Sequence, residues 1–218
     1  MIRENLKKIR DSVGKEVKIV AVTKKRSIDE IKEALNCGIT DIGENKIQEA
    51  RKKLPFLPKN ITKHFIGRLQ TNKVAEAVRL FDVIQSVDSP KLAQKINSEC
   101  LKIGKKMPVF IQVNTSGEPQ KGGVKPEDMD ELISKIADLP NIRVEGLMTI
   151  AIDSDNVGEV GKCFKLLKEL GSKLTACLPV GKAHSSKLWL SMGMTDDYKI
   201  AIEEGANMVR IGRGIFDN

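Results

Sequence analysis

One lysine stands where it could act as a nucleophile. Lys24 directly follows residues 20–23, an apolar and largely β-branched run that predicts a buried strand. An ammonium group at the end of such a strand is partly desolvated, and desolvation favours the neutral amine that forms a Schiff base with an aldehyde. Lys25 is an alternative, because neighbouring residues of a strand point to opposite faces. Either lysine could instead be an ordinary surface residue, and periodicity alone does not choose between them.

A second group of candidate residues lies near the C-terminus. Gly212, Arg213 and Gly214 follow a predicted strand at 208–211, and glycines let backbone amides approach a phosphate closely. Barrels of alternating strands and helices commonly bind phosphate after strands seven and eight. Ser191 ends the preceding strand candidate and could donate its hydroxyl to the same phosphate. A plain strand exit is the alternative interpretation of the glycine turn.

An arginine, Arg210, lies inside that apolar C-terminal strand. A buried guanidinium needs an acceptor, because a buried charge without a partner is costly. The acceptor is either a carboxylate or the ring nitrogen of a bound pyridine, which the arginine would keep unprotonated. Such a ring would be a poor electron sink. Asn45, just after the predicted strand at 40–43, and Asn114, at the end of the predicted strand at 109–114, are expected to donate hydrogen bonds to a ligand.

Three other polar residues are expected to have lesser roles. Thr71 is predicted to cap the helix that follows it. His64 is expected to begin a strand and to face away from the site, and His184 to lie in a loop, either at the surface or as an acid or base. The sequence contains no evident Ser/His/Asp set and no evident pair of catalytic carboxylates.

The elements that must position these residues follow from the hydrophobic periodicity. Short apolar runs alternate with longer amphipathic stretches along the whole chain. The strand candidates cover residues 17–23, 40–43, 64–67, 83–87, 109–114, 143–149, 188–192 and 208–211, and the helical patterns lie near 2–12, 28–37, 45–54, 72–80, 90–104, 127–138, 156–171 and 196–205. Ser27 and Glu30 form a capping box, and Gly38 and Gly205 are expected as left-handed C-caps.

Strands separated by helices pair in parallel through right-handed crossovers. Eight of them predict a (β/α)8 TIM-type barrel with an extra N-terminal helix, in preference to a doubly wound sheet. Residues 1–218 are expected to form a single domain, with the polar loop at 114–123 as a candidate lid.

The composition excludes several classes of protein. The net charge of +8 comes from basic residues interleaved with acidic ones, and aromatic residues make up 4%, so nucleic acid is not an expected partner. No apolar run approaches the roughly 18 residues of a membrane span, and the N-terminus lacks the features of a signal peptide. The four cysteines form no C-x-x-C pair. We therefore expect a cytoplasmic protein without a disulfide framework or metal site.

Taken together, the motifs resemble those of the pyridoxal phosphate homeostasis protein family, also called the proline synthetase co-transcribed homologue family. The resemblance spans nearly the whole chain and rests on Ala-Val-Thr-Lys at 21–24, Phe-Ile-Gly at 65–67 with Leu-Gln at 69–70 and Asn-Lys at 72–73, Gln-Val-Asn at 112–114, Gly-Leu-Met-Thr at 146–149, Ser-Met-Gly-Met at 191–194 and Val-Arg-Ile-Gly at 209–212 with Ile-Phe at 215–216. Each motif is weak alone, but their order and spacing are specific.

The resemblance implies a barrel similar to the N-terminal domain of alanine racemase, a fold type III pyridoxal 5'-phosphate (PLP) protein. It implies a Schiff base of PLP on Lys24 rather than Lys25, phosphate contacts at Ser191 and around Gly212 and Arg213, and Arg210 facing the pyridine nitrogen. The family usually continues past Ile-Phe-Gly, whereas Asp217 and Asn218 follow Phe216 here, so a final helix is expected to be short or absent.

The same resemblance separates an enzyme from a carrier. Amino acid racemisation needs a base on each face of the Cα, and alanine racemase supplies its tyrosine from a separate domain. The single tyrosine here, Tyr198, falls inside a predicted helix. We expect a monomeric protein that holds PLP and supplies or buffers it, with little or no catalytic turnover of substrates. PLP-dependent apo-enzymes are the expected protein partners. The alternatives are a PLP-dependent racemase using His184 or a cysteine, and a phosphosugar-processing barrel without cofactor.

Overall fold

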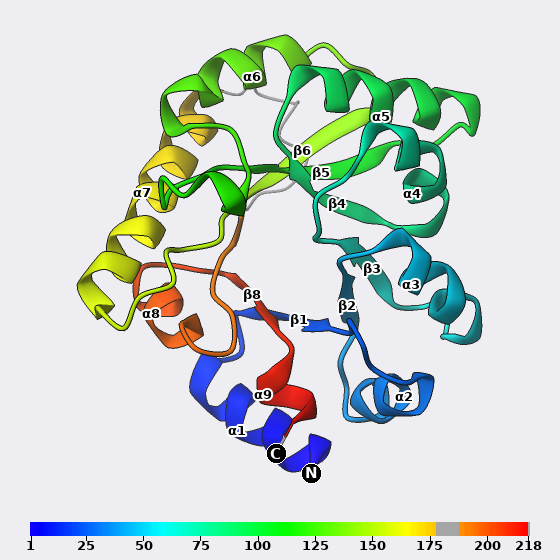
Figure 1. The fold of residues 1–218 in the computed structure, drawn as a ribbon, viewed down its shortest axis with the longest axis vertical. Helices are drawn as coiled ribbons and strands as arrows, with labels where there is room; N and C mark the ends of the chain where they lie inside the picture. The colour runs from blue at the N-terminus through cyan, green and yellow to red at the C-terminus, as the bar shows by residue number, and fades with distance from the viewer. Residues whose placement is uncertain (178–187, 218) are drawn as a thin grey trace.

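Eight parallel strands close into a barrel in chain order, with helices around the outside (Figure 1). The computed structural model describes residues 1–177 and 188–217. The strands are β1 Lys18–Val22, β2 Asp41–Glu44, β3 Thr62–Phe65, β4 Val83–Val87, β5 Met107–Gln112, β6 Ile142–Met148, β7 Trp189–Ser191 and β8 Met208–Ile211. The predicted (β/α)8 barrel is therefore confirmed, and the doubly wound sheet is excluded because β8 pairs with β1.

The helices follow the strands as the periodicity predicts. They are α1 Ile2–Val13, α2 Ile28–Asn36, α3 Ile47–Lys53, α4 Val74–Leu80, α5 Pro90–Lys102, α6 Met129–Ile136, α7 Val157–Cys177, α8 Tyr198–Glu203 and α9 Arg213–Phe216. The Ser27–Glu30 capping box is formed at the start of α2, and Gly38 and Gly205 have positive φ angles of 87° and 100°. These local signals determine where helices begin and end.

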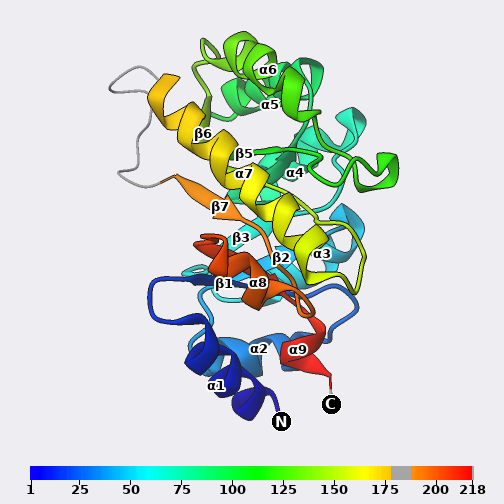
Figure 2. The ribbon, with the colours of Figure 1, turned by 90° about the vertical axis from the view of Figure 1, so that its left-hand side faces the viewer.

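One helix is longer than its sequence pattern indicates. The pattern ends near residue 171, but α7 continues to Cys177 along the outside of the barrel (Figure 2). Gly171 lets the helix lie close to β7, because a Cβ at that position would be only 2.9 Å from Leu190 Cδ2. Gly171 is thus a position of close packing between α7 and β7.

The barrel is closed at the seam between β1 and β8. Lys18 to Ala21 pair in register with Met208 to Ile211. The last helix, α9, has only four residues, as expected, and α1 packs beside it so that the two ends of the chain are neighbours (Figure 1). Asn5 Nδ2 donates to the carbonyl oxygens of Ile215 and Asp217 at 3.2 and 3.1 Å. A short C-terminal helix therefore does not prevent closure.

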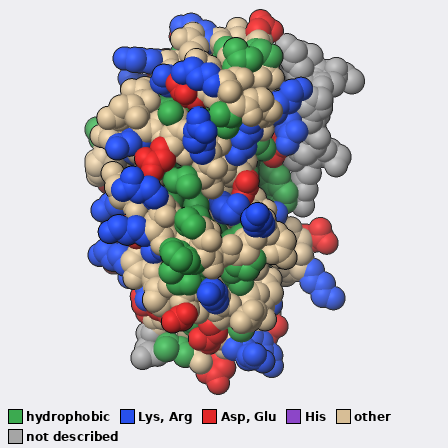
Figure 3. All heavy atoms as spheres, turned by 90° about the vertical axis from the view of Figure 1, so that its right-hand side faces the viewer, with side chains coloured by type: hydrophobic (Ala, Val, Ile, Leu, Met, Phe, Trp, Pro, Cys, Tyr) green, Lys and Arg blue, Asp and Glu red, His purple; other side chains and the backbone are tan. Residues whose placement is uncertain are grey.

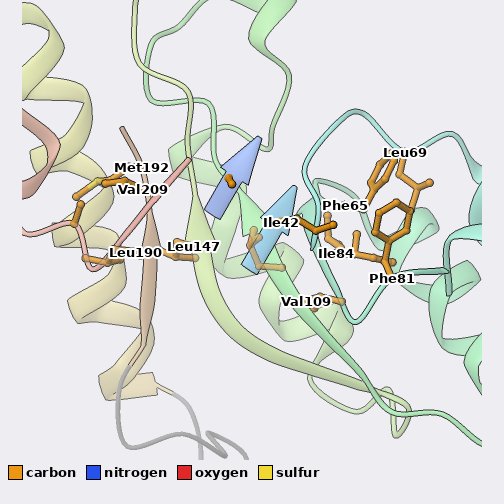
Figure 4. Close-up of a cluster of buried hydrophobic side chains, with 14 of the residues drawn as sticks. Ile42, Phe65, Leu69, Phe81, Ile84, Val109, Leu147, Leu190, Met192 and Val209 are labelled. Carbon is orange, nitrogen blue, oxygen red and sulfur yellow. The ribbon is translucent and has the colours of Figure 1, made fainter. Parts of the chain in front are cut away.

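The apolar core has two parts. The larger part lies between the strands and the helices and includes Phe65 and Phe81, whose rings meet edge to face at 5.2 Å (Figure 4). The smaller part is a separate cluster of strand residues, which are Val20, Val83, Phe110, Met148 and Met208. Other strand residues are polar yet buried, and among them are His64, Gln85, Ser191 and Arg210. A polar group buried in a barrel needs hydrogen-bond partners, which are described below.

The surface carries mixed charge. On the face made mainly by α2 to α5, Lys and Arg side chains are scattered among acidic and apolar ones (Figure 3). Within the described ranges, no helix combines the length and apolar character that crossing a bilayer requires. The same part of the chain contains no cluster of His, Cys, Asp and Glu suited to a metal ion.

Candidate functional site

The predicted site residues gather at the carboxyl end of four neighbouring strands. Lys24 follows β1, Asn45 follows β2, Ser191 ends β7, and Arg210 lies in β8. The strands β7, β8, β1 and β2 are adjacent in this order. Residues that are far apart in sequence therefore lie around one edge of the barrel, where TIM-type barrels carry their binding sites.

The environment of Lys24 differs from the expectation. The strand β1 ends at Val22, so Lys24 lies two residues beyond it, and its side chain is exposed rather than partly desolvated. The expectation was wrong because the apolar run does not continue as strand up to the lysine. Lys25 has a left-handed backbone with a φ of 60°, so the chain turns immediately after Lys24. The lysine is placed at the open mouth of the barrel.

The loop that carries Lys24 is fixed on both sides by α3 and β2. Before Lys24, Thr23 Oγ1 donates to Glu44 Oε1 at 2.7 Å, and Lys53 Nζ donates to the Thr23 carbonyl oxygen at 2.8 Å. After it, the Lys25 backbone N–H donates to Glu49 Oε2 at 2.9 Å. The Lys24 backbone is thus anchored at both neighbours. These anchoring residues lack a motif, and Glu44, the last residue of β2, lies just outside the strand that the sequence predicts at 40–43.

Glu44 is the most buried charged member of this anchor. Burial raises the pKa of its carboxyl, and hydrogen bonds from Thr23 and Lys53 act against that rise. Lys53 Nζ lies 3.0 Å from Glu44 Oε1 and 3.2 Å from Glu49 Oε2. Glu44 Oε2 is buried without a hydrogen-bond partner among the described residues. The ion pair therefore compensates one oxygen of a carboxylate that is taken out of water.

Arg210 is buried and makes no ion pair with any carboxylate of the described residues. Its Nη1 donates to the Ser191 carbonyl oxygen at 2.6 Å and to Ser191 Oγ at 2.9 Å, and its Nη2 donates to the Thr149 carbonyl oxygen at 2.7 Å. Burial lowers the pKa of Arg210 to about 10, while the Asp197 charge acts to raise it. The group is thus cationic at neutral pH, and two of the five N–H donors of a guanidinium have no acceptor among the described residues.

Ser191 supports Arg210 in this structure. Its side chain is fully buried, and its hydroxyl donates to Gln85 Oε1 at 2.7 Å while accepting from Arg210. The single hydroxyl proton is therefore already used, although the sequence indicates that it could be donated to a phosphate. Sequence reasoning missed Gln85, although Gln85, like Arg210, is a polar residue inside a strand that is mostly apolar.

His64 is placed differently from the expectation. It is the third residue of β3 rather than the first, and it is buried. It hydrogen-bonds Asp41 Oδ1 at 2.9 Å and Gln85 Nε2 at 2.9 Å, and Gln85 connects it to Ser191. The expectation that it faces away from the site was wrong, because His64 lies within β3 rather than at its start, and its ring contacts polar residues of the neighbouring strands β2 and β4.

The glycine turn after β8 forms the short helix α9. Gly214 N–H donates to Thr195 Oγ1 at 3.2 Å, which ties the turn to the loop after β7. The Arg213 side chain is exposed and pairs with Asp196 on that loop. Beside them a cleft of about 630 Å³ is lined by residues that include Asp153, Asp196 and Arg213. The turn, the loop after β7 and this cleft adjoin the end of β8.

Asn45 has an unsatisfied polar atom. Its Oδ1 is buried without a hydrogen-bond partner among the described residues. Its backbone also approaches the end of the next strand closely, because a Cβ on Gly67 would lie 2.1 Å from the Asn45 carbonyl oxygen. Only glycine fits at that position. A buried polar atom of this kind normally has a partner, which a ligand can supply.

The other candidates are not free to contact a ligand in the same way. Asn114 Nδ2 donates to the Glu118 carbonyl oxygen, and its Oδ1 accepts from Ser116 Oγ and Gly117 N–H, so it stabilises its own loop. Thr71 does not cap α4, because it begins a 3-10 turn and makes no capping hydrogen bond, and the prediction was wrong. His184 lies outside the described residues.

The chain is similar to known proteins along almost all of its length. It matches the family described as alanine racemase, N-terminal domain, over residues 1–217. It is 41% identical to the pyridoxal phosphate homeostasis protein of Aquifex aeolicus over 200 residues, which cover 91% of this chain and 86% of that protein. The structure of PipY of Synechococcus elongatus PCC7942 with PLP bound is 32% identical, with a TM-score of 0.89, and the match covers 99% of this chain and 100% of PipY.

More distant structures share the fold. An alanine racemase of Clostridium difficile 630 matches with a TM-score of 0.80 at 19% identity, covering 100% of this chain and 55% of the racemase. The closed barrel and the family match over residues 1–217 place the chain in the class of alanine racemase-type barrels. Within this class, the chain belongs to the pyridoxal phosphate homeostasis protein family. The resemblance inferred from the sequence motifs is therefore confirmed.

Proposed function

We propose that this protein holds PLP at the carboxyl end of its barrel and buffers or supplies it, with little or no turnover of substrates. The observation that carries the proposal is the buried Arg210, whose printed partners among the described residues are two carbonyl oxygens and a hydroxyl, and which retains unused N–H donors near the ends of β7 and β8. Such a cation favours a ligand with an acceptor atom. The family's relatives are named for PLP homeostasis, which supports PLP as this ligand.

The residues present fit that cofactor. Lys24 offers an exposed amine, Arg210 offers donors for a ring nitrogen, and the buried Asn45 Oδ1 has no partner among the described residues. The turn at Gly212 and Arg213 offers backbone amides and a cation for a phosphate. When bound, PLP supplies an aldehyde that accepts an amine. The protein's part is to present Lys24 to it, and Ser191 holds the guanidinium that faces the ring.

A carrier is favoured over a racemase by the position of the single tyrosine. Tyr198 begins α8, and its hydroxyl lies 2.9 Å from Ser12 Oγ on α1. That contact directs the phenol to the outer helix layer, away from the ends of β1 and β8. For Tyr198 to act as the second base of a racemase, its hydroxyl would have to leave Ser12. We therefore propose a holding role for the site, in which Lys24 is a tether.

The attachment point can be tested by chemical trapping. Purified protein saturated with PLP is treated with borohydride, digested and mapped by mass spectrometry, and we expect the pyridoxyl group on Lys24. The Lys24→Ala variant should lose the label, whereas the adjacent Lys25→Ala variant should keep it. A label on Lys25 or elsewhere would contradict the site, and no label on the wild type would contradict PLP binding. Solvent deuterium exchange into amino acid Cα positions would test for racemase chemistry.

The cellular setting follows from the same proposal. We propose a cytoplasmic monomer that passes PLP to apo-enzymes. Cys37, Cys100 and Cys163 are free thiols, which fits a reducing compartment. The molar mass of the purified holo-protein, measured by light scattering, tests whether it is a monomer. A second experiment tests whether delivery of PLP needs contact. A PLP-dependent apo-enzyme is either mixed with the holo-protein or separated from it by a dialysis membrane, and its activation is compared between the two arrangements.

A further inference from the structure

A continuous chain of buried side chains connects the cofactor site to the opposite part of the barrel. Arg210 Nη1 donates to Ser191 Oγ at 2.9 Å, and Ser191 Oγ donates to Gln85 Oε1 at 2.7 Å. Gln85 Nε2 meets His64 Nδ1 at 2.9 Å, and His64 Nε2 meets Asp41 Oδ1 at 2.9 Å. The chain therefore crosses from β8 and β7 through β4 and β3 to β2.

For the neutral His64 ring, the chemistry of the two ends fixes the direction of every hydrogen bond in this chain. A guanidinium can only donate, and an ionised carboxylate can only accept. Burial acts to raise the pKa of Asp41, but hydrogen bonds from His64 and Thr40 outweigh it and lower the pKa to about 2. Asp41 is thus an acceptor at neutral pH, and Lys18 Nζ also donates to it at 3.0 Å. His64 must carry its proton on Nε2, because that nitrogen faces the carboxylate.

The middle of the chain follows from the two ends. With the proton on Nε2, His64 Nδ1 is an acceptor, so the Gln85 amide nitrogen must face it. The Gln85 oxygen then faces Ser191 and accepts its hydroxyl proton. Ser191 in turn presents a lone pair to Arg210. Turning the Gln85 amide around would place its oxygen against the lone pair of Nδ1 of the neutral His64 ring, so that two acceptors would face each other.

The chain is also shielded from water. Of its middle members, His64 is 2% exposed, and Gln85 and Ser191 are 0% exposed. Buried hydrogen bonds are electrostatically stronger than solvated ones and polarise each other when they point the same way. Water cannot replace a lost member at such exposures without rearrangement. A substitution of Gln85 is therefore expected to change the hydrogen bonding of Ser191 and Arg210.

We infer that His64 and Gln85 are positioning residues for the cofactor site. They orient the Ser191 hydroxyl so that its oxygen, and not its proton, faces Arg210, and they thereby hold the guanidinium with its unused N–H donors available to a ligand. Asp41 anchors the far end of the chain. The role assigned to the ligand rests on the proposed function, whereas the direction of the chain does not.

The direction is tested on the protein without PLP. The protein contains two histidines. Selective ¹⁵N labelling of histidine, with a His184→Gln variant for assignment, therefore isolates the His64 signals. At pH 8 we expect the tautomer protonated on Nε2, and the Nδ1 shift should change in Ser191→Ala. The matched control is Ser86→Ala, which deletes the hydroxyl of a neighbouring buried serine outside the chain. A proton on Nδ1, or a shift that ignores Ser191→Ala, would overturn the inference.

The coupling to the ligand is tested by PLP titration followed by absorbance. Gln85→Met keeps the size of the side chain but cannot donate to His64 or accept from Ser191. We expect the PLP affinity to fall about tenfold, which corresponds to the loss of one hydrogen bond between the Arg210 guanidinium and the ligand. Ser86→Ala should bind like the wild type. In the wild type, PLP should also move the His64 Nδ1 shift, which a merely structural residue would not show.

The outcomes separate the two proposals. If the wild type binds PLP and Gln85→Met binds it equally well, the positioning role fails while the proposed function stands. If the wild type does not bind PLP, the proposed function fails. The tautomer of His64 then still tests the direction of the hydrogen bonds in the chain. If Gln85→Met does not fold by circular dichroism, Ser191→Ala in the same titration must show the loss of affinity, and normal binding by it would overturn the inference.

Discussion

At the scale of single residues, Arg210 shows why a buried charge is informative. It contacts two carbonyl oxygens and a hydroxyl, and these contacts leave it cationic without a carboxylate among the described residues. Its planar guanidinium reaches Ser191 and Thr149 at once while keeping donors free. A lysine has one compact head group with three donors and cannot replace this geometry.

We therefore expect Arg210→Lys to weaken PLP binding about tenfold or more, because hydrogen bonds to a charged group are worth roughly 1.5–3 kcal/mol. The control is Arg51→Lys, since Arg51 on α3 is exposed and forms only a 3.8 Å pair with Glu76. Absorbance titration of both variants measures the affinities. Equal affinities for Arg210→Lys and wild type would show that the guanidinium does not contact the cofactor.

At the scale of elements, the short helix α3 holds the loop that carries Lys24. Lys53 donates to the Thr23 carbonyl oxygen and pairs with the buried Glu44. Removing one partner of a buried pair is more damaging than losing a surface pair, because the remaining charge stays buried. The position of an exposed lysine thus depends on an ion pair beneath its loop.

Lys53→Met should accordingly lower the free energy of unfolding by about 3 kcal/mol. The Lys52→Met change on the same helix should alter it by less than about 0.5 kcal/mol, because Lys52 is exposed. Urea denaturation followed by circular dichroism gives both values. If the two variants were equally stable, the Lys53–Glu44 pair would not anchor the loop.

At the scale of the whole molecule, closure of the barrel assembles the site. The pairing of β1 with β8 sets Val20 opposite Arg210 and Ala21 opposite Ile211, so Lys24 and Gly212 follow neighbouring strands although they are far apart in sequence. The helix α1 packs over this seam through Ile2, Leu6, Ile9 and Val13, its buried residues. The N-terminal helix therefore supports the seam between the two strands that lead to Lys24 and Gly212.

Shortening a buried side chain of α1 tests this support. Leu6 is 1% exposed, and Leu6→Ala should lower the free energy of unfolding by about 2–5 kcal/mol, the usual cost of a large-to-small core change. Lys8→Ala on the exposed face of the same helix is the control and should have little effect. Thermal unfolding measures both. A negligible loss in Leu6→Ala would mean that the barrel is held closed without α1.

The sequence by itself determined the alternation of strands and helices, the capping box of α2, the left-handed glycines Gly38 and Gly205, and the family. These features are local, because a capping box, a left-handed glycine or an apolar strand depends on residues close together in the chain. Lys24 and Arg210 were found for the same reason, as polar residues at the end of or within apolar runs.

Only the tertiary structure decided how these residues are arranged. The exposure of Lys24 depends on where β1 ends, and the roles of Gln85 and His64 depend on which strand residues face one another across a closed barrel. Such contacts join residues that are far apart in sequence, so no local pattern specifies them. The physical reason is that a buried polar group takes its meaning from its partners, and the fold chooses those partners.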